Sequence, residues 1–143
     1  MSEPESEPAS MIKPVLYVFV NKGLGMSAGK IAAQVAQATV GAYRLSPQAN
    51  QEDWWAEHNG QHHTTYVMGA RDETHLYNIQ QYLSMRGFNS YMMIDEGLTE
   101  VDPHTATVLA VEIVDKADGS VGNTFGLFEL YRDILRVSLE FER

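Results

Sequence analysis

Hydrophobic and polar positions along the chain follow two spacings, one typical of strands and the other typical of helices. Residues 15–20 are a continuous run of β-branched, aliphatic and aromatic side chains, which predicts a strand buried on both faces. Runs of similar character cover residues 64–70, 91–94 and 107–114. We therefore predict four strands, with the first of them central in a sheet that helices cover on both sides.

Helical spacing appears between these strands. Apolar residues recur every three or four positions from the predicted N-cap Ser27 to Tyr43, and again in a segment that Asp72 caps. Gly87 follows that second helix in the position where left-handed backbone often ends a helix. Residues 51–58 predict a short additional helix or an extension of the first one.

The elements follow one another in the order β-α-β-α-β-β-α when a final helix over residues 125–135 is included. This order predicts an α/β fold, a single-domain mixed four-stranded sheet with helices on both faces. A length of 143 residues suits one domain and is short for two. Residues 1–12 are rich in Glu, Pro and Ser, so we predict a disordered acidic tail there and one folded domain over residues 13–143.

The composition narrows the possible classes of protein. The chain has no Cys, which removes disulfides, thiolate metal sites and thiol nucleophiles and fits a reducing compartment, so we expect a cytoplasmic protein. Its apolar runs are short and its N-terminus is acidic, so we expect neither a membrane span nor a secretion signal. The net charge of −9 is unfavourable for a protein that binds nucleic acid.

Lys30 stands where its charge is disfavoured. It lies in the first turn of the first predicted helix, where the macrodipole disfavours a cation by roughly several tenths of a kcal/mol. The glycines before it do not have the spacing of a phosphate-binding loop, and Ile31 replaces the hydroxyl residue, so we reject nucleotide hydrolysis. Two interpretations remain: a solvated surface lysine, which spacing alone favours, and an ammonium that stabilises an oxyanion or orients a carboxylate.

A second polar group follows the third predicted strand. Asp95 and Thr99 lie in the loop after it, and Thr107 begins the fourth strand. Polar residues at strand ends often build the site of an open α/β sheet, although Asp and Gly also occur in ordinary turns, and the residues alone favour neither interpretation. Without Cys or a G-x-S-x-G motif we expect no covalent acyl-enzyme, so a hydrolase of this kind would activate water directly.

Three histidines beside two tryptophans invite a metal-binding or base-stacking interpretation. They are His58, His62 and His63, next to Trp54 and Trp55. A metal would need a third well-placed ligand and supporting residues that the sequence does not reveal. We favour loop histidines and tryptophans that anchor the core or an interface, and we predict no metal site.

Two separated motifs resemble those of a known family. Residues 29–38, GKIAAQVAQA, resemble the G-K-[IV]-A-A-Q-x-x-H-A helix of the archaeal and eukaryotic (type 2) peptidyl-tRNA hydrolases. Residues 95–101, DEGLTEV, are similar to the family's D-A-G-R-T-Q-[IV] loop, and Pro103 and the TVLA of residues 107–110 follow in the same order. The resemblance covers most of the chain, residues 15–114.

The resemblance implies which residues carry the reaction. Lys30, Asp95, Thr99 and Thr107 stand at the positions that similar enzymes use for catalysis, and Gln34 stands at a motif position near them. It further implies a homodimer and no metal or organic cofactor.

Several motif positions differ in this chain. The family's second lysine is Ala28, its upstream acid is Gly23, its histidine is Gln37, its loop arginine is Leu98 and its loop glutamine is Glu100. Two cations that would lie near phosphates are absent and one acid is added, which lowers the expected affinity for tRNA. Besides Lys30, the basic residues that we name as candidates for substrate binding are Lys22, Arg44 and Arg71.

We therefore predict hydrolysis of the ester that links the peptide to the 3′ end of tRNA in peptidyl-tRNA, by directly activated water. In this hypothesis Asp95 orients and deprotonates the water, Lys30 keeps Asp95 ionised and stabilises negative charge, and the two threonines position the water or the carbonyl. One alternative is a catalytically inactive binding module of the same fold, which the missing basic residues favour. Another is an esterase or amidase for a different acylated substrate, which the negative charge favours.

Overall fold

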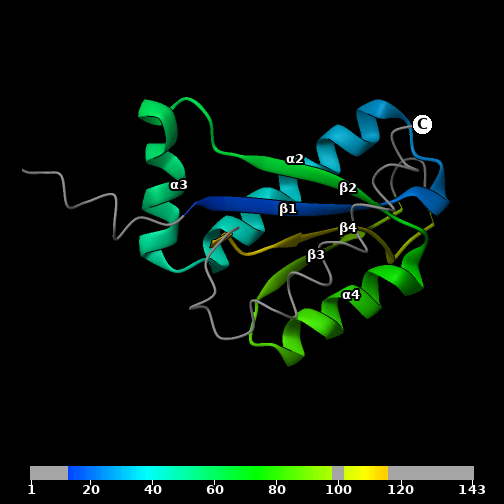
Figure 1. Ribbon diagram of the computed structural model, residues 1–143. Coiled ribbons are helices and arrows are strands. Elements are labelled where there is room, and N and C mark those ends of the chain that lie inside the picture. The colour runs from blue at the N-terminus through cyan, green and yellow to red at the C-terminus, as the bar shows by residue number, and fades with distance from the viewer. Residues whose placement is uncertain (1–12, 98–101, 116–143) are drawn as a thin grey trace, which may run out of the picture.

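Five strands and four helical segments make up the part of the chain that the computed structural model describes, residues 13–97 and 102–115 (Figure 1). The predicted tail and the predicted final helix lie outside the described residues, so the division into tail and domain stays a prediction. The elements in chain order are β1 (Pro14–Asn21), the 3-10 helix η1 (Lys22–Leu24), α2 (Ala28–Leu45), α3 (Gln48–Gly60), β2 (Thr65–Ala70), α4 (Glu73–Met85), β3 (Ser90–Asp95), β4 (Thr105–Val111) and β5 (Val114–Asp115).

The strands form one mixed sheet in the order β2-β1-β4-β3, with β5 paired to the start of β1. β1 is parallel to β2 and antiparallel to β4, and β3 is antiparallel to β4. β1, β2 and β3 therefore run in one direction and end at the same edge of the sheet. Every residue of β1 is buried, which confirms the predicted central strand.

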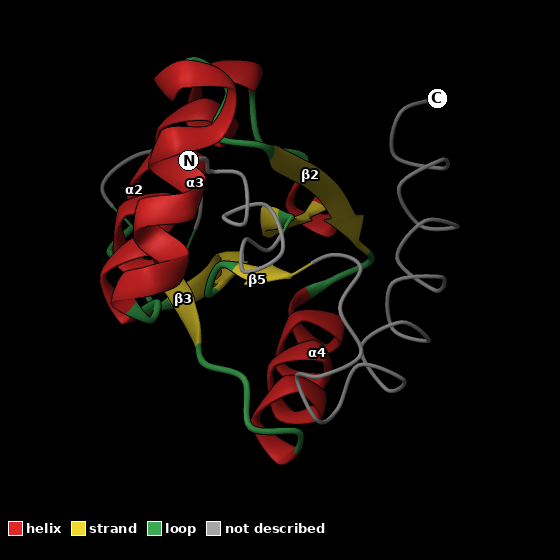
Figure 2. Cartoon of the chain, turned by 60° about the vertical axis from the view of Figure 1, so that its left-hand side comes forward, coloured by secondary structure: helices red, strands yellow, loops and turns green. Residues whose placement is uncertain are grey.

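Helices cover both faces of this sheet, as predicted. Figure 2 shows the strands between α2 and α3 on one side and α4 on the other. Alternate side chains of β1 divide between the two layers because successive residues of a strand point to opposite faces. Leu16, Val18 and Val20 pack with Ala38, Ala42 and Trp54 on the side of α2 and α3, and Val15, Tyr17 and Phe19 pack with Leu76, Ile79 and Leu83 on the side of α4.

The predicted helix boundaries agree closely with the structure. The Ser27 side chain accepts a hydrogen bond from the backbone N–H of Lys30 at 3.2 Å, and the Asp72 side chain accepts one from His75 at 2.8 Å. Gly87 has the expected left-handed backbone, with φ of 83°. α3 is longer than the predicted residues 51–58. Within the described residues, no helix combines the length and the apolarity that crossing a membrane requires.

The predicted fourth strand, residues 107–114, is wrong as a single element. β4 ends at Val111, and the chain pairs again only in β5, so the sheet has five strands instead of four. Between them the N–H of Glu112 bonds to the Asn89 carbonyl at 3.0 Å and the N–H of Ile113 bonds to Ser46 Oγ at 2.8 Å. Burial continues through the break, and Glu112, the one charged residue in this run, is also compatible with a continuous strand, so the pattern did not reveal the break.

Candidate active site

One edge of the sheet collects the residues that the sequence singled out. Asn21 and Ala70, the last residues of β1 and β2, are register partners, and β3 ends at this edge in Asp95. In Figure 1 the ends of β1 and β2 lie together with the beginnings of α2 and α4. α2 and α4 then run over opposite faces of the sheet. In open α/β sheets such an edge is the usual place for a ligand.

Lys30 and Asp95 form an ion pair at this edge. The Lys30 Nζ and Asp95 Oδ1 atoms are 2.6 Å apart, and the two side chains are only 10% and 7% exposed. The second carboxylate oxygen, Oδ2, accepts a hydrogen bond from the Gly97 N–H at 2.7 Å. Lys30 is therefore not a solvated surface lysine, and both oxygens of Asp95 are held by donors.

These donors set the charge of Asp95. The hydrogen bond from Lys30 and the backbone hydrogen bond from Gly97 lower the pKa of the Asp95 carboxyl below its usual value of 3.8, while burial acts in the opposite direction and is outweighed. Asp95 is thus a carboxylate at neutral pH. An ionised carboxylate next to an ammonium can orient water or a hydroxyl group and can stabilise developing charge.

The residues on either side of the loop after β3 contact one another and Asp95. Gly97 has φ of 81°, a backbone conformation that favours glycine. A Cβ added there would also lie 2.6 Å from the Pro103 ring, so the contact excludes a larger residue as well. The N–H of His104, a second residue with positive φ, donates to the Asp95 carbonyl at 2.6 Å. The predicted catalytic Thr99 lies in this loop, outside the described residues.

Thr107 reaches the site through Gln34. The Thr107 hydroxyl donates to Gln34 Oε1, and Met93 O lies 3.3 Å from the same hydroxyl. Thr107 is fully buried and Gln34 is 5% exposed. Gln34 stands four residues after Lys30, so both project from one face of α2. Its Nε2 donates to Gln37 Oε1 at 3.4 Å, on the side away from Thr107.

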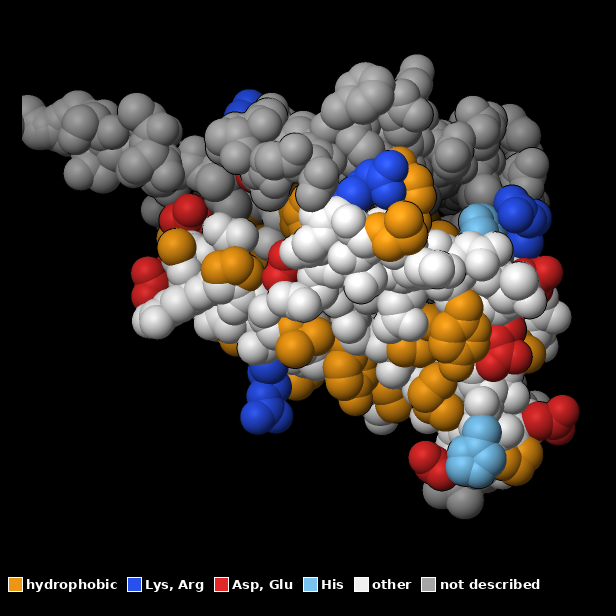
Figure 3. All heavy atoms as spheres, turned by 90° about the horizontal axis from the view of Figure 1, so that it is seen from below, with side chains coloured by type: hydrophobic (Ala, Val, Ile, Leu, Met, Phe, Trp, Pro, Cys, Tyr) orange, Lys and Arg blue, Asp and Glu red, His pale blue; other side chains and the backbone are white. Residues whose placement is uncertain are grey.

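The predicted basic residues divide between two ends of the molecule. Lys22 directly follows β1 and Arg71 directly follows β2, so both lie at the edge that carries Asp95. Arg44 stands in the last turn of α2, about 21 Å from Lys30 at a rise of about 1.5 Å per residue. On the face that Figure 3 shows, the Lys and Arg side chains are scattered and form no single patch.

Sequence reasoning missed two polar residues of this edge. Asn21, assigned only to a turn, is 2% exposed and donates from Nδ2 to the Ala106 carbonyl at 3.0 Å. Glu73 accepts a hydrogen bond on Oε2 from the Ala106 N–H at 2.9 Å. The available signal was a polar residue that ends a continuously apolar strand, but a turn explained it equally well.

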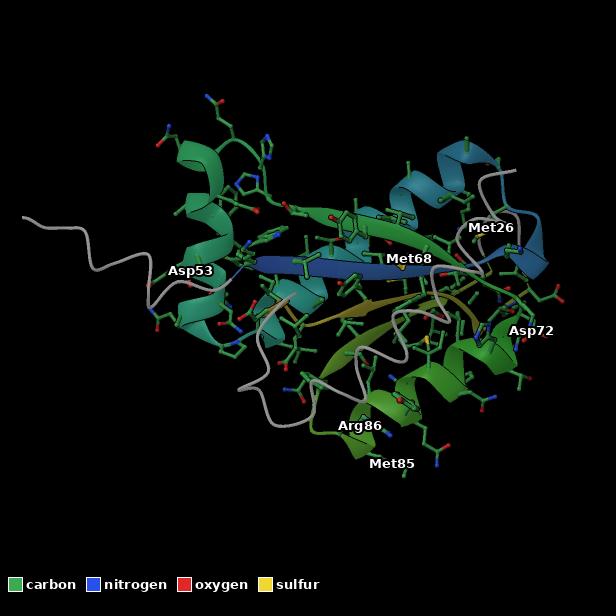
Figure 4. The ribbon with its side chains drawn as sticks, in the orientation of Figure 1. Met26, Asp53, Met68, Asp72, Met85 and Arg86 are labelled. Carbon is green, nitrogen blue, oxygen red and sulfur yellow. The ribbon has the colours of Figure 1, made fainter. Side chains whose placement is uncertain are left out.

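The aromatic and histidine cluster lies at the opposite end of the sheet. Figure 4 places Asp53 of α3 at that end, and Met26 and Asp72 at the end where β1 and β2 terminate. Trp54 is a core residue, as favoured, and its indole N–H bonds to the Thr64 carbonyl at 2.8 Å. His63 packs on Trp55 with ring centroids 4.2 Å apart. Among the side chains that the structure describes, which do not include that of His58, no three His, Asp or Glu residues form a group that could hold a metal.

A groove lies beside α4, away from the edge that carries Asp95. Tyr77, Gln81 and Met85 of α4 line it together with Asn89 and Ser90 at the start of β3. Neither a carboxylate nor a basic side chain is among its lining residues. The groove therefore offers no charged side chain for acid-base chemistry, whereas the Lys30–Asp95 edge does.

The fold and the site together define an α/β protein with a Lys30–Asp95 ion pair at the edge where open sheets usually bind ligands. The family model described as "Peptidyl-tRNA hydrolase PTH2" matches residues 14–130. The chain therefore belongs to this family, and the resemblance stated from its motifs is confirmed.

Individual relatives agree with this membership. A protein named peptidyl-tRNA hydrolase from Methanopyrus kandleri is 32% identical over 111 residues, which cover 73% of this chain and 92% of the relative. One of the same name from Thermococcus onnurineus is 36% identical over 107 residues, 70% of this chain and 88% of the relative. "Peptidyl-tRNA hydrolase 2, mitochondrial" from Mus musculus is 34% identical over 113 residues, 73% of this chain and 60% of the relative.

Proposed function

We propose that this chain hydrolyses the ester bond of peptidyl-tRNA with the Lys30–Asp95 pair at the centre of its site. Membership of the family gives the reaction class, a hydrolase that acts on an ester. The observation that carries the role of the pair is the 2.6 Å contact between Lys30 Nζ and Asp95 Oδ1, at the edge where an open sheet binds its ligand.

The chemistry follows from the state of the two side chains. Asp95 is a carboxylate at neutral pH because its pKa is lowered by the hydrogen bond from Lys30 and then by that from Gly97. Its remaining lone pairs accept a hydrogen bond from the attacking water and orient it toward the carbonyl carbon. A carboxylate of low pKa is a weak base, so the proton leaves the water as the new C–O bond forms, not before.

Lys30 stabilises the charge that this attack creates. Water adds to the ester carbonyl and passes its proton to Asp95, and negative charge develops on the carbonyl oxygen. The bond to the ribose oxygen then breaks while that oxygen takes up the proton that Asp95 accepted. The ammonium of Lys30 is held 2.6 Å from Asp95, so it is oriented before the substrate arrives. A fixed cation beside a developing oxyanion lowers the barrier without reorganisation.

Gln34, Thr107 and Thr99 complete the proposed site. Because Gln34 Oε1 accepts the Thr107 hydrogen bond, the amide N–H₂ of Gln34 is turned toward the opposite side and can donate to the carbonyl or to the ribose. Thr107 then acts by orienting Gln34, which sharpens the role proposed from the sequence. Thr99 remains a proposed catalytic residue of the loop after Asp95.

We also propose that Lys22 and Arg71 contact the tRNA backbone close to the ester and that Arg44 contacts it farther away. The presence of the Lys30–Asp95 pair argues against the alternative of a catalytically inactive binding module. An esterase or amidase for another substrate is not favoured, because the relatives from Methanopyrus, Thermococcus and mouse all carry the name of peptidyl-tRNA hydrolases.

The proposed assembly is a homodimer in the cytoplasm. The homodimer is supported by the resemblance to the family, and the location by the absence of Cys. The relative from Mus musculus is named mitochondrial, so cell fractionation is the measurement that decides the location. Sedimentation of the purified full chain decides the oligomeric state.

The deciding experiment measures release of labelled peptide from peptidyl-tRNA by the wild type, Asp95→Asn and Lys30→Ala. We expect Lys30→Ala to lose about 10²-fold to 10³-fold in kcat/KM, the usual cost of removing a group that stabilises an oxyanion. We expect Asp95→Asn to lose about 10²-fold to 10⁴-fold, the usual contribution of a group that takes a proton in the transition state. Lys13→Ala, which changes an exposed lysine directly before β1, serves as the control and keeps normal turnover. No release by the wild type contradicts the function, and equal release by all four proteins contradicts the site.

A further inference from the structure

We infer that Asn21 and Glu73 are positioning residues that together hold the strand segment carrying Thr107 and its partner strand carrying Asp95. The inference rests on the proposed function, because it concerns the geometry of that same site. It adds two residues to which neither the family motifs nor the family membership assigns a role.

The segment in question is a β-bulge. In the pairing of β3 with β4, Met93 is the partner of Val108, but the next residue, Ile94, is the partner of Ala106. Thr107 is therefore the extra residue on β4. A bulge bends its strand and redirects a side chain, and here the side chain of the bulged residue bonds to Gln34 in α2.

Next to the bulge, side chains instead of main-chain groups form the hydrogen bonds to β4. The described pairing of β1 with β4 ends at Val20 and Val108, and β1 then turns into η1. Beyond that point Asn21 Nδ2 donates to the Ala106 carbonyl at 3.0 Å, and Glu73 Oε2 accepts from the Ala106 N–H at 2.9 Å. Both main-chain groups of Ala106 are thus bonded by side chains, one from the end of β1 and one from the first turn of α4.

The amide of Asn21 is itself oriented by the turn that follows it. Asn21 Oδ1 accepts the N–H of Gly23 at 3.0 Å, which leaves Nδ2 facing Ala106. A Cβ at Gly23 would lie 2.8 Å from the Arg71 carbonyl oxygen, so only glycine fits here without a shift of backbone. Gly23 is also the position at which the family motif carries an acid, and in this chain the turn serves to aim Asn21.

Ala106 is joined to both halves of the site. It is the covalent neighbour of Thr107, and it is the register partner of Ile94, which precedes Asp95. Asp95 is the register partner of Thr105 on the other side of Ala106. A shift of Ala106 therefore disturbs the Thr107–Gln34 bond and the Lys30–Asp95 bond together, and a displacement of about 1 Å in a reacting geometry can cost about 10²-fold in rate.

The test uses substitutions that remove one hydrogen-bonding function at a time. Asn21→Asp keeps the acceptor for Gly23 and loses the donor to Ala106. Glu73→Gln keeps an acceptor for Ala106, whereas Glu73→Met has similar length and no comparable acceptor. We expect Asn21→Asp and Glu73→Met to lower kcat about 10-fold to 100-fold with KM within about twofold, and Glu73→Gln to restore near-normal kcat.

A matched control separates positioning from general destabilisation. Asn50 Nδ2 donates to the Ile113 carbonyl at 3.0 Å, the same kind of bond far from the site. Asn50→Asp should lower thermal stability and leave kcat unchanged. All rates are measured at a temperature at which circular dichroism shows each protein to be folded, and the side-chain amide signal of Gln34 is followed by NMR. We expect that signal to shift in Asn21→Asp and to stay in place in Asn50→Asp.

Lys30→Ala in the same assay distinguishes the two possible failures. If Lys30→Ala keeps normal turnover, the proposed site is wrong. If Lys30→Ala is inactive while Asn21→Asp and Glu73→Met keep normal kcat, the site stands and the positioning inference is overturned. Equal losses in Glu73→Gln and Glu73→Met, or a comparable loss in Asn50→Asp, also overturn it. If Asn21→Asp does not fold, the two Glu73 variants decide the question alone.

Discussion

The surroundings of two carboxyl groups in this protein shift their pKa values in opposite directions. The pKa of Asp95 is lowered, chiefly by the hydrogen bond from Lys30, and the pKa of Glu112 is raised above its usual 4.5, chiefly by burial, which the hydrogen bonds from Asn89 only partly offset. Asp95 is therefore held ionised by donors, whereas Glu112 is costly to ionise. A carboxylate whose pKa is shifted by strong hydrogen-bond donors, at the edge of an open sheet, is typical of a functional site.

These shifts predict two opposite dependences of stability on pH. Asp95 contributes stability above its unfolded pKa of 3.8, and this contribution is lost as the pH falls through the lower folded value. Glu112 contributes stability below its unfolded pKa, and this is lost as the pH rises through the folded value above 4.5. Urea denaturation across pH 2 to 8 should show Asp95→Asn approaching the wild type only in acid.

Glu112→Gln should gain stability relative to the wild type as the pH rises through the folded pKa of Glu112, which lies above 4.5. A constant difference between wild type and either variant at every pH would contradict the assigned shifts.

Gly97 offers a second prediction about a single residue. Gly97→Ala places a Cβ on backbone with positive φ and against Pro103, so we expect the free energy of unfolding to fall by about 1 to 3 kcal/mol. We also expect most activity to be lost, because the Gly97 N–H that bonds Asp95 must move. Gly87→Ala is the control, since it has φ of 83° and nothing within 4 Å of the added Cβ. It should lose stability from backbone strain and keep kcat. Loss of kcat in both variants would argue against a special role for Gly97.

Among the elements, those that depend on local chemistry were predictable. The run of β-branched and aromatic residues in β1 and the caps Ser27 and Asp72 act over a few neighbours, so the sequence revealed strand and helix boundaries directly. The Lys30–Asp95 pair was expected as one constellation because two motifs match one family in order. Asn21 and Glu73 were not expected, because their partner Ala106 is distant in sequence and contributes only main-chain atoms.

The break between β4 and β5 predicts a specific role for Ser46. This buried side chain donates from Oγ to the Ala42 carbonyl and accepts from the Ile113 N–H, each at 2.8 Å. Ser46→Ala leaves a buried N–H without this acceptor, so we expect a loss of about 1 to 3 kcal/mol in denaturant unfolding. The exposed Ser84→Ala should change stability little, and both variants should keep kcat. Equal stability of the two would contradict the assigned contact.

At the scale of the whole molecule, the net charge of −9 is unfavourable for binding a substrate whose RNA backbone is negatively charged. The basic side chains are few and scattered on the face in Figure 3, so binding depends on the small number of cations near the site. Lys22 and Arg71 lie at the edge that carries Asp95, and Arg44 lies at the far end of α2.

We therefore predict that Lys22→Ala and Arg71→Ala each weaken tRNA binding and reduce the slope of log affinity against log salt by about 1. Equilibrium binding of tRNA between about 50 and 200 mM salt measures this slope. Arg44→Ala should reduce it less if the tRNA lies mainly over the Asp95 edge. A salt-independent affinity of the wild type would exclude phosphate contacts as the source of binding.

The bonds that build this site also determine when it can form. Lys30 and Asp95 are 65 residues apart in the chain, Gln34 and Thr107 are 73 apart, and Asn21 and Ala106 are 85 apart. Closing contacts of such separation costs more chain entropy than forming helical turns, so we expect these contacts late in folding. Recovery of turnover after dilution from denaturant should therefore lag behind recovery of helical circular dichroism. Catalysis is then a reporter of completed folding, and a fragment that ends before β4 should be inactive however much helix it contains.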